Sequence, residues 1–214
     1  MNRYPKIRRA FAAVAGVALL SVPLAACGDD AGGPAPKAAA TVEEVSGGTT
    51  QVTLDQGFVD ALGSLGLTPG VFGEAKLEDG ALKFPITGGN VSVFTPGEVS
   101  PYVIGALFHD TSGLSLTAGN TKVELLNFIV DPAFSKVYGD VKVNGKFAVR
   151  KAYVFQLDGR TLKPATVEDN VATLEGTKVQ ISEVAAGLLN DVFKTDAVAG
   201  GLLVGIAKID VATS

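Results

Sequence analysis

The chain has 214 residues, of which 47% are hydrophobic and 19% are charged, with 26 glycines, no tryptophan and a formal net charge of −4. This acidic balance argues against nucleic-acid binding, which requires a basic surface. The single cysteine excludes an intrachain disulfide and any zinc or iron–sulfur centre built from several cysteines.

The first 26 residues have the pattern of a bacterial signal peptide. Four basic residues precede an apolar run from Ala10 to about Leu24. This run is shorter than the roughly 20 apolar residues that a membrane span needs, and it suits the apolar region of an export signal. The pair Arg8-Arg9 resembles part of a twin-arginine export motif, and ordinary N-terminal charge explains it equally well. We therefore predict export, by a route that the sequence leaves open.

The apolar run ends in Leu24-Ala25-Ala26-Cys27, which resembles the lipobox of bacterial lipoproteins. The resemblance implies a diacylglyceryl group on the sulfur of Cys27 and cleavage after Ala26; the alternative is a plain secretory signal with an incidental cysteine. Cleavage removes four positive charges and no negative ones, so the formal charge falls from −4 to −8. Attachment to the membrane would then come from the acyl chains and not from charge. We predict an extracytoplasmic lipoprotein held in the cell membrane by its lipid.

Residues 27–48 contain almost no large apolar side chain and are predicted to be a flexible tether. The carboxylates Glu43 and Glu44 fall in this tether, so they are expected to be solvated and not catalytic. The pattern changes from Thr49 onward, and we predict a single β-rich domain over residues 49–214.

Two short helices are predicted in this domain. Asp55 is a suitable N-cap for a helix whose apolar residues run from Phe58 to Leu65, and a strand with Val52 and Leu54 precedes it. Ser182 is the corresponding cap for a helix with an apolar stripe from Val184 to Phe193.

The remaining elements are predicted strands joined by tight turns. Asp79-Gly80, Asn144-Gly145 and Asp158-Gly159 are hairpin turn dipeptides. Strands at intervals of about 8–12 residues indicate a mainly β domain, an antiparallel sandwich or flattened barrel, with the two helices. Leu82, Phe84 and Ile86 alternate with other residues after Asp79-Gly80 and predict a strand. The further predicted strands are Val103–Phe108, Leu114–Leu116, Val123–Val130, Val137–Val143, Phe147–Leu157, Val171–Leu174, Val179–Ile181 and Leu202–Val211.

The sequence offers little material for catalysis or metal binding. His109 is the only histidine, and Asp110 beside it would point to the opposite face of a strand, so the two do not make a catalytic pair. No Gly-x-Ser-x-Gly or His-x-x-x-His pattern occurs, and the acidic turns around Asp158 and Asp169 lack the spacing of a calcium-binding loop. We predict no catalytic site and no metal site.

Residues from Gly80 to Gly145 resemble the core of HtaA-type domains, which occur in cell-surface haem-uptake proteins of actinobacteria. The resemblance rests on Ala-Leu-Lys-Phe-Pro-Ile-Thr-Gly-Gly ending at Gly89, on Phe-His-Asp-Thr-Ser-Gly-Leu-Ser-Leu ending at Leu116, and on the two strand segments that follow. It implies a β-sandwich-like domain in which a tyrosine holds haem with a histidine near by.

The histidine of that family corresponds to His109. Its tyrosine segment has no match near Phe58, which leaves Tyr102, Tyr138 and Tyr153 as candidates in the mature chain. The simpler interpretation of His109 is a hydrogen-bonded turn residue, and on that interpretation the domain has no cofactor.

Three functions follow from these observations. The first is a non-catalytic binding or interaction module of the cell envelope, which takes a small apolar ligand between sheet and helices or an envelope protein along a strand edge. The second is haem binding in the manner of the HtaA-type domains. The third, an envelope-anchored enzyme, is disfavoured by the residues present.

Overall fold

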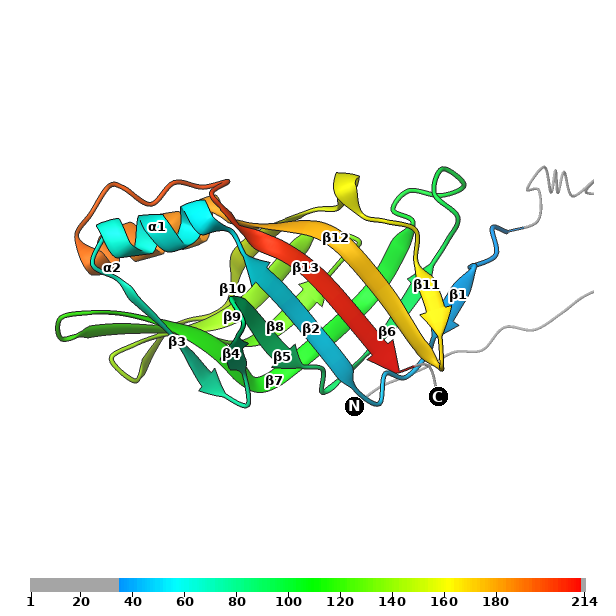
Figure 1. Ribbon diagram of the computed structural model, residues 1–214, viewed down its shortest axis with the longest axis horizontal. Helices are drawn as coiled ribbons and strands as arrows, with labels where there is room; N and C mark the ends of the chain where they lie inside the picture. Colours follow the sequence, from blue (N-terminus) through cyan, green and yellow to red (C-terminus); the bar gives the residue numbers. More distant parts are fainter. Residues whose placement is uncertain (1–34, 213–214) are drawn as a thin grey trace, which may run out of the picture. The chain divides into compact units, whose positions relative to one another are not determined.

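The structure is a computed structural model that describes residues 35–212. Within this part of the chain, thirteen antiparallel strands join in one sheet, and two α-helices lie at one end of it (Figure 1). The predicted signal peptide and the predicted lipidation site at Cys27 lie outside the described residues and stay predictions.

The elements follow one another along the chain as β1 (Ala40–Val42), β2 (Gly48–Leu54), α1 (Gln56–Ser64), β3 (Thr68–Gly73), β4 (Lys76–Glu78), β5 (Ala81–Pro85), β6 (Gly88–Val93), β7 (Val103–Ala118), β8 (Thr121–Asp131), β9 (Lys136–Val143), β10 (Lys146–Asp158), the 3-10 helix η1 (Gly159–Thr161), β11 (Thr166–Glu168), β12 (Val171–Ile181), α2 (Glu183–Phe193) and β13 (Leu203–Ala212).

The sheet is continuous and strongly curled. Its strands follow the order β1-β6-β7-β8-β9-β10-β12-β13-β2-β5-β4, while β3 pairs with β7 and β11 pairs with β12. The curl brings β5 close to β7, because the chain passes from β5, near one end of this order, directly into β6, which pairs with β7 near the other end. The backbone N–H of Thr87, between β5 and β6, donates to the carbonyl of Phe108 on β7 over 2.8 Å. The prediction of a mainly β, antiparallel fold with two helices is confirmed, and the curled sheet is closer to the flattened barrel than to a sandwich of two sheets.

Bulges in neighbouring strands bend the sheet. The register shifts between His109 and Gly113 where β7 pairs with β8, and further shifts follow in the β8–β9 and β9–β10 pairs. Asn127 ties the bulges together, because its side chain accepts from the backbone N–H of Thr111 at 3.1 Å and donates to Asp140 at 3.1 Å. Asp140 in turn accepts from the backbone N–H of Lys151 at 2.9 Å. Since a bulge increases local twist and bends its strand, this polar chain helps to set the curvature that encloses the interior.

Both helices begin where the sequence predicts. The carboxylate of Asp55 accepts from the backbone N–H of Gly57, and the hydroxyl of Ser182 accepts from that of Ala185. Each helix packs on the sheet with a few apolar residues, among them Phe58 and Leu62 of α1 and Leu189 of α2. Neither helix is long and apolar enough to cross a membrane, and the same holds for every helix within residues 35–212.

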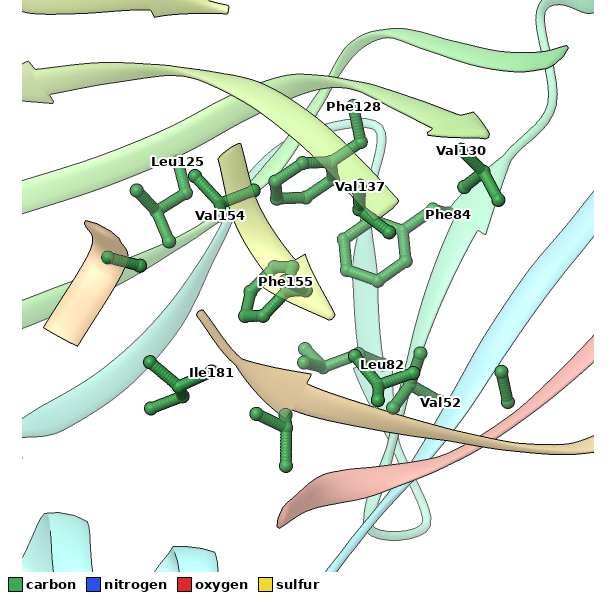
Figure 2. Packing of buried hydrophobic residues seen from close by; sticks show 14 of the residues in the cluster. Val52, Leu82, Phe84, Leu125, Phe128, Val130, Val137, Val154, Phe155 and Ile181 are labelled. Carbon is green, nitrogen blue, oxygen red and sulfur yellow. The ribbon is translucent and has the colours of Figure 1, made fainter. Parts of the chain in front are cut away.

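Aromatic and aliphatic side chains line the concave side of the sheet. Figure 2 shows the rings of Phe84, Phe128 and Phe155 close together among valine and leucine side chains. The centroids of Phe84 and Phe128 are 5.4 Å apart at right angles, and those of Phe128 and Phe155 are 5.9 Å apart. Edge-to-face packing at this separation is favourable for aromatic rings. These three rings come from β5, β8 and β10, so they hold distant parts of the sheet together.

The predicted tether and one predicted hairpin turn differ from the structure. Residues 40–48, assigned to the tether, enter the sheet through β1, and Val42 and Val45 are buried. Asp158-Gly159 does not form a hairpin turn, because Asp158 caps η1 instead. The hairpin turn follows later at Asp169, between β11 and β12.

Candidate functional site

The curled sheet encloses a cavity of about 620 Å³. Side chains from β2, β5, β7, β8, β9, β10, β12 and β13 line it, and most of them are aliphatic or aromatic. Pockets of about 300–1,000 Å³ with apolar walls and few polar groups are typical of sites for small ligands. This cavity is the candidate functional site of the domain.

His109 and Thr50 form a polar pair in the wall of the cavity. His109 lies on β7 and Thr50 on β2, and these two strands are not neighbours in the sheet. The Nε2 atom of His109 is 2.7 Å from Oγ1 of Thr50, and its Nδ1 atom is 3.4 Å from the carbonyl oxygen of Phe128. Both side chains are buried, with 1% of His109 and 7% of Thr50 exposed. The pair therefore links two strands that both lie beside β5, across the place where the curl closes.

His109 lies within a long strand and not at a turn. The two strands predicted on either side of it are one strand, β7, interrupted by the bulge at Thr111. The interpretation of His109 as a hydrogen-bonded residue is supported, but its setting is the interior of the sheet. Asp110 is exposed on the other face, as the alternation of side chains along a strand predicts.

Burial keeps the imidazole of His109 neutral. The loss of hydration lowers the pKa of His109 from its ordinary value of 6.5 to about 4, although the carbonyl of Phe128 and the carboxylate of Asp110 act in the opposite direction. A buried neutral imidazole is one donor and one acceptor, so it suits the pair with Thr50. The imidazole ring also lies edge-to-face against the ring of Phe84, with the two ring centroids 6.4 Å apart.

The three candidate tyrosines fall in two different places. Tyr102, in the loop before β7, lines the cavity together with His109. Tyr138 and Tyr153 do not line it. They face each other across β9 and β10 with ring centroids 6.2 Å apart, and Tyr138 follows the cavity residue Val137, so it points to the opposite face. The structure thus brings one of the three tyrosines to the same cavity as the histidine.

A charged pair stands at the edge of the cavity. Arg160 donates to Asp158 through Nε at 2.9 Å and through Nη2 at 2.7 Å. The hydrogen bonds from Arg160 lower the pKa of Asp158 to about 2. The side chain of Arg160 is 88% exposed, so this end of the lining opens to solvent.

The site has the chemistry of a binding pocket. Within residues 35–212, no group of three or more histidine, cysteine, aspartate or glutamate side chains is placed to hold a metal ion. Among the residues that line the cavity, the buried polar ones are His109 and Thr50, and each already has a hydrogen-bond partner. Such a wall can enclose an apolar molecule and orient it by one polar contact.

The sequence pattern did not point to Thr50 or to the aromatic wall. Thr50 shares the inner face of β2 with Val52, because the two residues are two positions apart in the strand. A polar residue at an inward position was the one sign in the sequence that Thr50 could belong to a site. Phe84, Phe128 and Phe155 stand at comparable positions of β5, β8 and β10. Their convergence depends on the curl of the sheet, which the sequence pattern does not define.

No protein-family model matches the sequence, and no curated protein matches it significantly. The fold is similar to the C-terminal domain of HtaA from Corynebacterium glutamicum, with a TM-score of 0.54 and 13% sequence identity. This match covers 78% of the present chain and 97% of the other. It confirms that the resemblance to HtaA-type domains extends to the fold.

Two further solved structures match with lower scores. The domain-swapped dimer of the H434A variant of the same HtaA domain has a TM-score of 0.47 and 12% identity, covering 74% of this chain and 91% of that one. The heme binding protein HtaB from Corynebacterium glutamicum has a TM-score of 0.39 and 10% identity, and the match covers 82% of this chain and 96% of that one.

Proposed function

We propose that this domain is a non-catalytic binding module of the HtaA type, which takes an apolar small molecule of about the size of haem into its interior cavity. The observation that carries the proposal is the apolar cavity of about 620 Å³ inside the curled sheet. The likeness of the fold to the HtaA domain favours a ligand-binding module over one that acts only through its surface. The lipid on Cys27 and the display of the domain outside the cytoplasm are part of the same proposal.

Haem is the first ligand to test, and the residues fit it only in part. The apolar walls suit the face of a porphyrin. His109 does not fit as an iron ligand, because both ring nitrogens have partners and only 1% of the side chain is exposed. Tyr102 is the remaining candidate, since it is the tyrosine that lines the cavity.

Titration of the protein with haem, followed by absorbance, tests this ligand. If haem is the ligand, the Soret band shifts saturably near one equivalent, and the shift is weakened in Tyr102→Phe. Tyr138→Phe is the matched control, because Tyr138 does not line the cavity. A flat titration of folded protein would exclude haem.

Binding of the neutral dye Nile red tests the cavity independently of haem. We expect dye fluorescence to rise on binding and to be blocked by Ala207→Phe, which fills the cavity from β13. Ile206→Phe is the control, because Ile206 lies next to Ala207 on β13 and is 37% exposed. If neither haem nor Nile red binds, or if both variants bind the dye equally, the proposed function is wrong.

A further inference from the structure

The hydrogen bonds of His109 assign the proton positions in the cavity wall. The carbonyl oxygen of Phe128 can only accept, so the Nδ1 atom of His109, 3.4 Å away, carries the proton. In a neutral imidazole the other nitrogen then has a free lone pair. The hydroxyl of Thr50 is 2.7 Å from this nitrogen and must donate its hydrogen to it.

Thr50 consequently offers only lone pairs to the cavity. A threonine hydroxyl has one hydrogen, which Thr50 donates to His109 in a hydrogen bond, and two acceptor sites on Oγ1. Thr50 lines the cavity, while its partner His109 is almost fully enclosed. The buried polar contact that Thr50 offers to the cavity is therefore a hydrogen-bond acceptor.

The charges around the cavity support an uncharged ligand. Asp158 and Arg160 neutralise each other at the solvent end. A ligand carboxylate placed against Thr50 would face the lone pairs of an oxygen, with no cation beside it to balance its charge. A ligand ammonium group would lose its hydration, with no carboxylate beside it to replace the lost interaction. Either arrangement buries an unpaired charge, which is costly.

We propose that the cavity takes an uncharged apolar molecule with a single hydroxyl group at its buried end, such as a long-chain alcohol, and that this hydroxyl donates to Oγ1 of Thr50. The inference rests on the proposed binding function of the cavity and names the class of ligand for it. The apolar body of the ligand lies against the ring cluster of Phe84, Phe128 and Phe155.

Displacement of Nile red by matched probes tests this inference. The probes are 1-tetradecanol, its methyl ether and tetradecanoate, which share the same alkyl chain. The alcohol has a hydrogen-bond donor, the ether has only an acceptor, and tetradecanoate has a negative charge. A hydrogen bond contributes about 0.5–1.5 kcal/mol, so we expect the alcohol to bind roughly threefold to tenfold more tightly than the ether. Tetradecanoate is expected to bind more weakly than the alcohol.

Substitutions at Thr50 identify the acceptor. Thr50→Val has nearly the same shape and is expected to abolish the preference for the alcohol, whereas Thr50→Ser keeps a hydroxyl and should retain it. Thr177→Val is the matched control, since Thr177 also lines the cavity but has no hydrogen bond to His109. Thermal unfolding establishes that each variant is folded.

The outcomes separate the two proposals. If Nile red binds but the alcohol and the ether compete equally, or tetradecanoate competes best, the inference about Thr50 is wrong and the binding function stands. A preference that survives in a folded Thr50→Val variant also overturns it. If Nile red does not enter the cavity, the proposed function itself fails.

Discussion

Lowering the pH is expected to destabilise the protein through the buried imidazole of His109. Burial lowers the pKa of this group to about 4, whereas an unfolded histidine titrates near 6.5. Between these two values the unfolded chain binds a proton that the folded chain does not bind. The stabilisation is therefore complete above about pH 6.5 and is lost as the pH falls toward 4. His109 is the only histidine of the chain, which makes its contribution separable in this range.

The size of the effect follows from the width of the range. Each pH unit between the two pKa values changes the free energy of unfolding by about 1.4 kcal/mol. From pH 7.5 to pH 4.5 the protein should lose about 2.5 kcal/mol, which is a large share of the roughly 5–15 kcal/mol that stabilises a typical domain.

Urea denaturation at intervals of half a pH unit between pH 7.5 and 4.5 measures this loss. We expect His109→Gln to be less stable at neutral pH but to lack the slope, because the amide does not titrate. Asp110→Asn is the control, since it removes a neighbouring carboxylate on the other face and leaves the imidazole buried. Equal stability of the unsubstituted protein across the range, or the same slope in His109→Gln, would refute the reasoning.

Three other predictions test the core, the pairing of β3 with β7, and the anchor. Phe128→Ala should lower the free energy of unfolding, measured by urea denaturation, by about 3–5 kcal/mol, because it removes the central ring of the cluster with Phe84 and Phe155. Phe134→Ala is the control and should change this free energy by less than about 0.5 kcal/mol, because Phe134 is 71% exposed. Equal effects of the two substitutions would contradict the packing of the ring cluster. Gly73 and Gly66 both have φ of +63°, but only at Gly73 would an added Cβ overlap a backbone carbonyl of β7. Gly73→Ala should therefore reduce the melting temperature more than Gly66→Ala does. The reverse order would be inconsistent with the close approach of β3 to β7. Cys27→Ala should release the protein from sedimented membranes and remove the acyl mass seen by mass spectrometry, and a variant that still sediments would show that the lipid is not the anchor.

The sequence determined the local features of the domain. Strands follow from alternating apolar side chains, and turns and caps depend on residues close in the chain. Asp55 and Ser182 cap helices where predicted, because a cap is a contact over two or three residues. Asn144-Gly145 forms its hairpin because both residues adopt positive φ, which Asn and Gly tolerate.

Only the tertiary structure decided the site. Thr50 and His109 are 59 positions apart and meet because the sheet curls, and the curl depends on bulges that shift the alternation of β7, β8 and β10. Since one extra residue in a strand moves the following side chains to the opposite face, the pattern alone could not tell that Tyr153 on the bulged strand β10 does not line the cavity. Tyr102 lines it from the loop before β7, where no strand alternation applies. The acceptor at Thr50 likewise follows from a hydrogen bond between two strands that are not neighbours in the sheet.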